Sequence, residues 1–414
     1  MSFAGGCILG GIWNSPLILG ASNWGALLTC VPWFIAAALT GLFFLAINIS
    51  WSRLPKSAFA LFISLAWLGL VYLANLLQYP LTFSATLAFS NPWFIHTFSS
   101  LGFYGLELLI ILCSCMPIIF FNADHMISTI TTLILFFTSS LPLTNKQPDE
   151  KIITIAAIQP SIEHSSFLAT SWSLHERKEI EDKVDALTIR GLAIKPDIVV
   201  WPEGANGLDN FNIPRRISQT HQFRSSGRSE LLLTGYEYDE DNNKFNSAVL
   251  ISPNGQSQSA RKTQLAPIAE SNLRKGSPAV LHSSHGNLGI AICFDALFNA
   301  HFEALTKMKS DFFFIVTDDS SLARTNLPYI HASYVILFSA IYKKPAVFVN
   351  NNGVSFATGS RGEILDIDYS GRLPQVYSWR IASNIESPGW LALHQYVYFA
   401  ILALLVVGLT RKHL

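Results

Sequence analysis

Hydrophobic and polar positions are distributed very unevenly along the chain. A bilayer is crossed by about 20 consecutive apolar residues, and six stretches reach roughly that length. They lie at 3–22, 26–49, 57–78, 101–121, 125–143 and 391–409. The pattern predicts a transmembrane helical domain over 1–145 and a C-terminal transmembrane helix with a short basic tail over 389–414.

The region between these parts, 146–388, has a different pattern, in which short apolar runs alternate with amphipathic ones. Strands are expected at 152–158, 197–201, 230–236, 245–251, 288–293, 311–316 and 346–350, with a hairpin over 354–366. Helices are expected at 172–194, 212–224, 297–309 and 327–342. Near-continuous apolar strands are typical of sheets buried on both faces. The predicted fold class is therefore α/β, with helices covering the sheets.

Charge supports this division and predicts an orientation. Only 14% of the residues are charged, and those before residue 146 are Arg53, Lys56, Glu107 and Asp124. Basic residues favour cytoplasmic loops. Arg53 and Lys56 lie between the second and third apolar stretches, and a second basic cluster forms the tail at 411–413. We therefore expect 146–388 outside the cytoplasm, that is, in the periplasm. A miscount of one span would place it inside. A net charge of zero gives no indication of a nucleic-acid partner.

Two apolar runs end on reactive side chains. The run 196–203 ends on Glu203, and the run 288–293 ends on Cys293. Lys262 lies between them in sequence, and a second acid, Glu270, follows the lysine by eight residues. Each residue alone has an ordinary explanation, as a strand-end acid, a solvated lysine or a buried structural cysteine. Their joint occurrence in this order favours a Glu-Lys-Cys triad for acyl transfer.

The cysteines narrow the chemistry further. Of the five cysteines, only Cys293 lies in the polar region, and their spacing fits neither a disulfide framework nor a zinc site. We expect a helix N-terminus and a nearby cation to lower the pKa of this thiol. Asp318 and Asp319 suit a turn or a helix cap better than a cation site. No metal and no cofactor are expected.

Four motifs together resemble the carbon–nitrogen hydrolase (nitrilase) superfamily. They are Trp201-Pro202-Glu203; Lys262 followed by Leu265, Pro267 and Glu270; Ile292-Cys293-Phe294-Asp295; and Asn-Asn-Asn-Gly-Val at 350–354. The apolar stretches on both sides resemble one branch, the bacterial apolipoprotein N-acyltransferases. The resemblance implies a four-layer α-β-β-α sandwich.

The resemblance also implies roles. Glu203 would be the general base, Cys293 the nucleophile, and Lys262 with the backbone N–H of Phe294 the oxyanion donors. Glu270 would position Lys262 or the acceptor amine. The implied substrates are a phospholipid acyl donor and an amine such as a lipoprotein N-terminus, at the bacterial inner membrane.

The chain departs from this branch at several places. Asp295 stands where a glutamate is usual, which leaves its role open. The segment 334–340 lacks the usual arginines, although His331 falls where the family tends to have a histidine. The membrane part is also shorter. Two alternatives therefore stay open: a membrane-anchored amidase that passes the acyl group to water, and an accessory nitrilase-like protein of conjugal transfer with weak or no catalysis.

Overall fold

The computed structural model describes residues 26–76, 84–85, 88, 95, 99–120, 152–162, 174–205, 228–266, 269–320, 327–368 and 373–383. The N-terminal elements are α3 (Ala26–Trp51), α4 (Lys56–Leu76), η1 (Ser99–Leu101) and α7 (Gly102–Phe120). The helices that follow are α9 (Leu174–Ala193), η3 (Cys293–Leu297), α12 (Asn299–Lys307) and α13 (Leu327–Tyr342). The strands are β1 (Ile152–Gln159), β2 (Ile198–Val200), β3 (Glu230–Tyr238), β4 (Lys244–Ile251), β5 (Ser257–Arg261), β6 (Val280–Ser283), β7 (Gly286–Ile292), β8 (Phe312–Thr317), β9 (Ala346–Asn350), β10 (Ser355–Thr358), β11 (Ile364–Asp368) and β12 (Gln375–Ala382).

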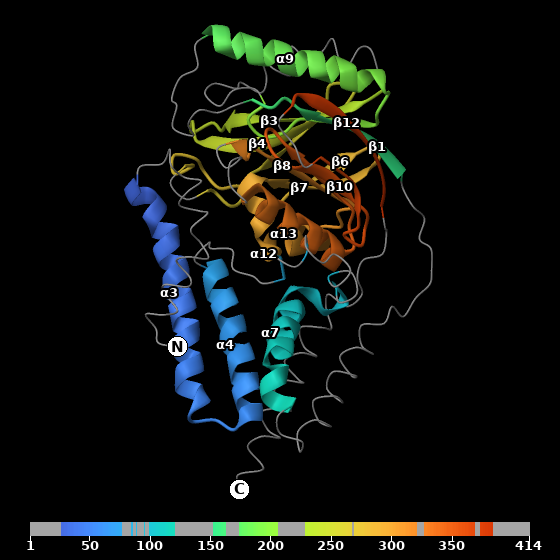
Figure 1. Ribbon diagram of the computed structural model, residues 1–414. Helices are drawn as coiled ribbons and strands as arrows, with labels where there is room; N and C mark the ends of the chain where they lie inside the picture. Colours follow the sequence, from blue (N-terminus) through green and yellow to red (C-terminus); the bar gives the residue numbers. More distant parts are fainter. Residues whose placement is uncertain are drawn as a thin grey trace.

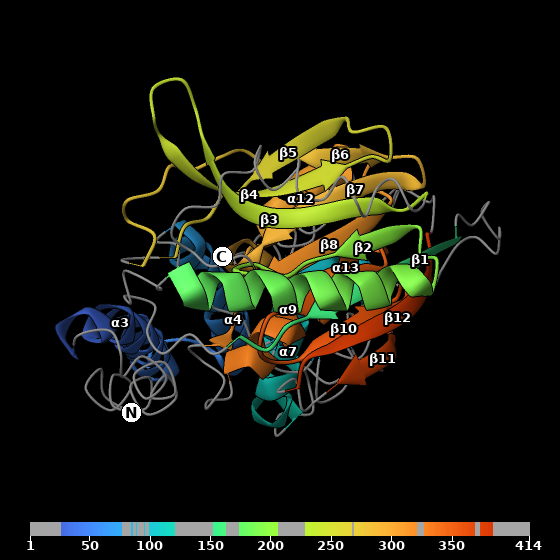
Figure 2. The same cartoon turned by 90° about the horizontal axis from the view of Figure 1, so that it is seen from above.

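The strands form two six-stranded sheets. The β1 sheet has the order β12-β1-β2-β3-β4-β5, and the β8 sheet has the order β11-β10-β9-β8-β7-β6. In each sheet the three strands β1-β2-β3 or β7-β8-β9 run parallel, and antiparallel strands flank them. Seen from above in Figure 2, β5 and β6 lie at one edge of the sandwich, and β11 and β12 lie at the other.

Helices cover the outer face of each sheet, which gives four layers (Figure 1). Val184 and Leu187 of α9 pack against the outside of the β1 sheet. Phe302 of α12 and Phe338 of α13 pack against the outside of the β8 sheet. A third apolar cluster fills the space between the sheets. The predicted α/β class and the expected α-β-β-α layering are therefore confirmed.

The residue pattern of β8 explains why such strands are apolar throughout. Phe312, Phe314 and Val316 belong to the cluster between the sheets, whereas Phe313 and Ile315 belong to the cluster under α12 and α13. Successive side chains of a strand point to opposite faces, and here both faces are buried. In a strand buried on both faces, apolar and polar residues do not alternate.

Most predicted elements of this region are confirmed within a few residues. The hairpin turn at 359–362 forms as expected, with Gly362 at φ +77° and its N–H bonded to the carbonyl of Gly359 at 3.1 Å. Three strands were not predicted: β5, β6 and β12. All three lie at sheet edges, where one side of the strand is unpaired and polar residues are tolerated. The helix expected at 212–224 lies outside the described residues.

The N-terminal helices pack beneath α13 (Figure 1). The rings of Phe103 and Phe338 lie 5.9 Å apart between centroids, and side chains of α4 and α7 join the same apolar cluster as α13. Helices occupy three of the expected apolar stretches, 26–49, 57–78 and 101–121. Over the described residues, no helix is long and apolar enough to cross a membrane. The stretches 3–22, 125–143 and 391–409 lie outside the described residues.

Candidate active site

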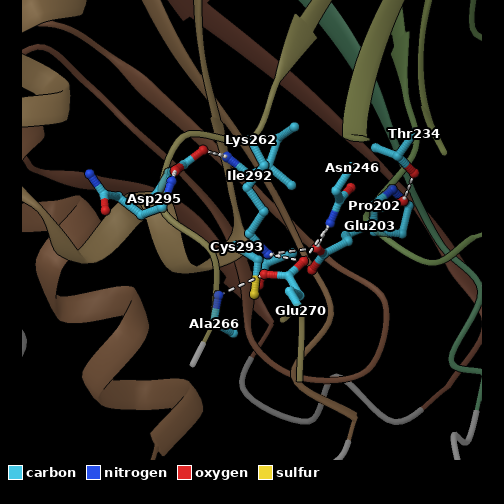
Figure 3. A network of polar contacts seen from close by, with 12 residues as sticks. Pro202, Glu203, Thr234, Asn246, Lys262, Ala266, Glu270, Ile292, Cys293 and Asp295 are labelled. Carbon is cyan, nitrogen blue, oxygen red and sulfur yellow. Dashed lines mark hydrogen bonds and ion pairs between the residues drawn. The ribbon is translucent and has the colours of Figure 1, made fainter. Parts of the chain in front are cut away.

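Strand ends from both sheets place the predicted triad in one location. Glu203 follows β2 by three residues, Lys262 directly follows β5, and Cys293 directly follows β7. The first two belong to the β1 sheet and the third to the β8 sheet. Because the two sheets face each other, side chains separated by 90 residues in sequence lie beside one another (Figure 3). Glu270 joins them from the loop after β5.

Lys262 lies between two carboxylates. Its Nζ donates to Oε1 of Glu203 at 3.0 Å and to Oε1 of Glu270 at 2.9 Å. The exposed fractions of Lys262, Glu203 and Glu270 are 1%, 7% and 4%. A buried charge is tolerated only where it is paired and hydrogen-bonded. The two acids therefore hold the ammonium in place, and its third N–H is a donor that the two carboxylates do not use.

Asn246 of β4 is part of this cluster, although sequence reasoning missed it. Its side-chain amide donates to Oε1 of Glu203 at 2.6 Å and to Oε1 of Glu270 at 2.9 Å. The other oxygen of Glu270 accepts the backbone N–H of Ala266 at 2.7 Å. A polar residue beside Ser247 in an otherwise apolar strand was the available signal. With Lys262 and Asn246, each of the two carboxylates has two donors on one oxygen.

Burial and mutual charge shift the pKa values of this cluster. Burial raises the pKa of Glu203, and the charge of Glu270 raises it further, while Lys262 lowers it. Burial lowers the pKa of Lys262, but Cys293, Glu203 and Glu270 outweigh this effect, so the pKa lies well above its usual value. The lysine stays protonated, and the glutamate is a stronger base than an exposed one.

The expectation of a lowered thiol pKa was wrong. Burial raises the pKa of Cys293 well above its usual value, and the charge of Glu203 adds to the rise, against the opposing effect of Lys262. The helix that begins at the thiol is η3, a single short 3₁₀ segment of five residues, so little dipole opposes these effects. A neutral thiol of this kind needs a base to become a nucleophile, and Glu203 is the adjacent candidate.

The backbone of Cys293 is in the left-handed region, with φ +48°. A non-glycine residue in this region costs on the order of 1–3 kcal/mol and persists only where its surroundings hold it. The thiol is therefore presented on a tight strand-to-helix turn, and its side chain keeps partial exposure.

Asp295 stabilises the turn at Cys293 through buried hydrogen bonds. Its exposed fraction is 1%. One oxygen accepts from the hydroxyl of Thr263 at 2.7 Å and the N–H of Gln264 at 2.6 Å, and the other accepts from the N–H of Ile292 at 3.1 Å. The carboxylate thus ties the segment after Lys262 to the residue before Cys293. The short side chain of Asp295 therefore links the ends of the two strands that precede Lys262 and Cys293.

Phe294, Asp318 and Asp319 were also named from the sequence. The ring of Phe294 lies edge-on to Phe298, with 5.2 Å between centroids, and its backbone N–H follows the thiol directly in the chain. Asp318 and Asp319 follow β8 and accept side-chain amide groups of Asn351 and Asn350. Among the described residues, no group of three or more His, Cys, Asp or Glu side chains could hold a metal ion.

Part of the chain is similar in sequence to curated proteins. The chain is 24% identical over 234 residues to apolipoprotein N-acyltransferase of Geobacter metallireducens, covering 51% of this chain and 44% of the relative. For the same enzyme of Bdellovibrio bacteriovorus the identity is 29% over 204 residues, covering 41% and 37%. The chain is a distant homologue of apolipoprotein N-acyltransferase. The matched part spans less than half the length of either relative.

Solved structures that match part of this chain include a carbon–nitrogen hydrolase and an amidase. The carbon–nitrogen hydrolase from Helicobacter pylori is 14% identical and covers 60% of this chain and 93% of its own, with a TM-score of 0.48. An amidase from Nesterenkonia sp. is 15% identical and covers 61% and 95%, with a TM-score of 0.46. No protein-family model matches the chain. The two facing six-stranded sheets with helices outside form the four-layer sandwich that the sequence resemblance implied.

Proposed function

We propose that this protein is a membrane-bound acyltransferase that moves an acyl group from a phospholipid, through a thioester on Cys293, to an amine such as a lipoprotein N-terminus. The observation that carries the proposal is the ammonium of Lys262, held between the buried acids Glu203 and Glu270 beside the strained turn of Cys293. The distant homology to N-acyltransferases supports the choice of an amine acceptor.

In the first half-reaction, Glu203 takes the thiol proton and Sγ of Cys293 attacks the ester carbonyl carbon. A C–S bond forms, and the carbonyl oxygen becomes an oxyanion. The third N–H of Lys262 and the backbone N–H of Phe294 donate to it. The C–O bond then breaks, the leaving alkoxide takes the proton from Glu203, and a lysophospholipid departs. The thioester and an ionised Glu203 remain.

In the second half-reaction the acceptor amine attacks the thioester carbon. Glu203 takes a proton from the attacking nitrogen, and the same two donors stabilise the second oxyanion. The C–S bond breaks, an amide forms, and the thiolate regains its proton from Glu203. Glu270 and Asn246 stay in place throughout, because their contacts hold Lys262 and Glu203 at a fixed separation.

The proposed location is the bacterial inner membrane, with the region 146–388 in the periplasm. It rests on the sequence alone, that is, on the apolar stretches and the basic residues Arg53 and Lys56, because over the described residues no helix is long and apolar enough to cross a membrane. A reporter enzyme that is active only in the periplasm tests it. Fused after Thr144 the reporter should be active, and fused after Leu414 it should be inactive. The reverse pattern would place the site in the cytoplasm and remove a periplasmic lipoprotein as the acceptor.

The acyl-enzyme itself is the decisive test of function. Purified full-length protein incubated with phospholipid vesicles and no amine should gain one acyl mass on the Cys293 peptide, and hydroxylamine should remove it. Cys293→Ala should show no gain. Cys113→Ala, which changes a cysteine of the apolar region, is the matched control and should behave as the wild type.

Discharge of the adduct separates the alternatives. An amine peptide that accelerates loss of the acyl mass and gains it supports the transferase. Loss to water at the same rate with or without amine replaces the transferase with the amidase. Absence of any adduct with ester and amide donors, together with retention of biological function in Cys293→Ala, would favour the accessory protein of conjugal transfer.

A further inference from the structure

A buried histidine contacts the backbone of Cys293. Nε2 of His331, near the start of α13, lies 3.0 Å from the carbonyl oxygen of Cys293. Nδ1 of the same ring lies 3.1 Å from Oδ1 of Asp319. The exposed fractions of the two side chains are 7% and 1%. The mechanism above uses neither residue.

The contacts determine the protonation of the ring. A carbonyl oxygen only accepts, so Nε2 must carry a proton. The carboxylate of Asp319 also accepts, so Nδ1 carries one as well, and the ring is an imidazolium. Burial lowers the pKa of His331, but the charge and hydrogen bond of Asp319 outweigh it, and the pKa lies above its usual value. The histidine therefore presents a cation to the carbonyl of Cys293.

Asp319 is fixed in turn by the end of β9. Its Oδ2 accepts from Nδ2 of Asn350 at 2.6 Å, and its own N–H donates to Oδ1 of Asn350 at 3.1 Å. The ring of His331 also lies edge-on to Phe348, with 5.2 Å between centroids. Asp319 and Phe348 thus contact the imidazolium directly, and Asn350 fixes Asp319.

The carbonyl of Cys293 belongs to the same peptide group as the N–H of Phe294. In a planar trans peptide, the C=O and the N–H point in opposite directions, so fixing one fixes the other. A hydrogen bond to the carbonyl oxygen also polarises the group and makes its N–H a stronger donor. A cation at the oxygen strengthens this effect.

We propose that His331, held by Asp319, is a positioning residue that orients and polarises the peptide between Cys293 and Phe294, so that the Phe294 N–H donates more strongly to the oxyanion. The inference rests on the proposed acyl-transfer function, because only a reaction with an oxyanion needs this donor. It also accounts for the left-handed backbone at Cys293, φ +48°, which requires a contact that holds it.

The test compares two reactions of the same thiol in full-length protein. Acylation by p-nitrophenyl butyrate passes through an oxyanion, whereas alkylation by iodoacetamide is a displacement at carbon that forms none. Both rates are followed by mass spectrometry of the Cys293 peptide. His331→Phe removes the donor and keeps an aromatic ring, and His331→Gln places a neutral amide donor where Nε2 was. His282→Phe, at an exposed position of strand β6, is the matched control.

His331→Phe should lower the acylation rate about tenfold, less than the loss of a whole oxyanion donor, and leave alkylation within about twofold. His331→Gln should recover most of the acylation rate, and His282→Phe should change neither. Equal losses of both rates in His331→Phe, or no loss in either, would overturn the inference. If wild-type protein is alkylated but accepts no acyl group from any ester, the proposed function fails first, and the oxyanion role fails with it.

Discussion

The two sheets contribute different kinds of chemistry to the site. The β1 sheet supplies the proton-transferring acid Glu203, the cation Lys262 and the neutral hydrogen-bond donor Asn246. The β8 sheet supplies the thiol of Cys293 and, through the loop after β8 and α13, contacts to its backbone. One half of the site adjusts pKa values, and the other half fixes the geometry of a peptide group.

This difference determines how substitutions should act. The charged side chains of the β1-sheet half, Glu203, Lys262 and Glu270, lie in one buried cluster. Removing one charge therefore changes the protonation of the others. Contacts in the β8-sheet half act on a backbone peptide, so their loss changes the orientation of that peptide and keeps Glu203, Lys262 and Glu270 in place. The first kind of variant should move pH profiles, and the second should change rates at every pH.

The largest effect is expected for Lys262→Met. The change removes an oxyanion donor and leaves Glu203 and Glu270 side by side without their cation, so that one acid takes up a proton. The acylation rate of Cys293 should fall by about 10²–10³, measured by mass spectrometry with an ester donor. Lys275→Met, at an exposed lysine of the same loop, should have no effect. A loss below tenfold would contradict the assignment of Lys262.

A smaller effect on rate, with a clear effect on stability, is expected for Asp295→Ala. The change leaves the N–H groups of Ile292 and Gln264 without their acceptor, and each unsatisfied buried group costs about 1–3 kcal/mol. Chemical denaturation should show a loss of about 3 kcal/mol. Because Asp295 ties both halves together, acylation and alkylation of Cys293 should fall by the same factor. Asp241→Ala, at an exposed turn, is the control.

Asn246→Asp should change the pH dependence more than the maximal rate. The rate requires ionised Glu203, so it falls as the pH falls through the pKa of this residue, which burial already raises. A third carboxylate beside Glu203 raises that pKa further, so the acid limb of acylation should move to higher pH. His331→Phe should move the limb less than Asn246→Asp does. A limb that moves equally in both variants would remove the distinction between the two halves.

The sequence allowed the triad to be predicted because Glu203 and Cys293 end apolar runs, Lys262 lies between them in sequence, and the order matches a known pattern. Glu203, Lys262 and Cys293 needed no knowledge of packing to be selected. Their convergence did need it, since the strands before Lys262 and Cys293 belong to different sheets. The layered fold was predictable for the same reason: its central strands are buried on both faces and read as unbroken apolar runs.

The remaining features depended on contacts across the sandwich. Asn246 was missed because one polar residue in a strand does not indicate which neighbour it meets. The raised pKa of Cys293 was missed because local sequence suggests a helix dipole, whereas burial and the charge of Glu203 arise from distant segments. His331 reaches the carbonyl of Cys293 from 38 residues away, and no local pattern signals such a contact. β5, β6 and β12 were missed because edge strands tolerate polar residues.

The smallest effect is expected at the opposite edge of the sandwich, where the sheets meet without contributing to the site. There Trp379 of β12 donates its indole N–H to Asp366 of β11 at 2.9 Å. Asp366→Ala leaves that N–H unsatisfied and should lower the free energy of unfolding by about 1 kcal/mol, measured with urea. Asp366→Asn keeps an acceptor and should lose less. Neither variant should alter acylation of Cys293, because the link joins the same two sheets at a point where no residue of the triad lies. A change in acylation rate with unchanged stability would show that the two halves are coupled through the whole sandwich, and would contradict their separation at the site.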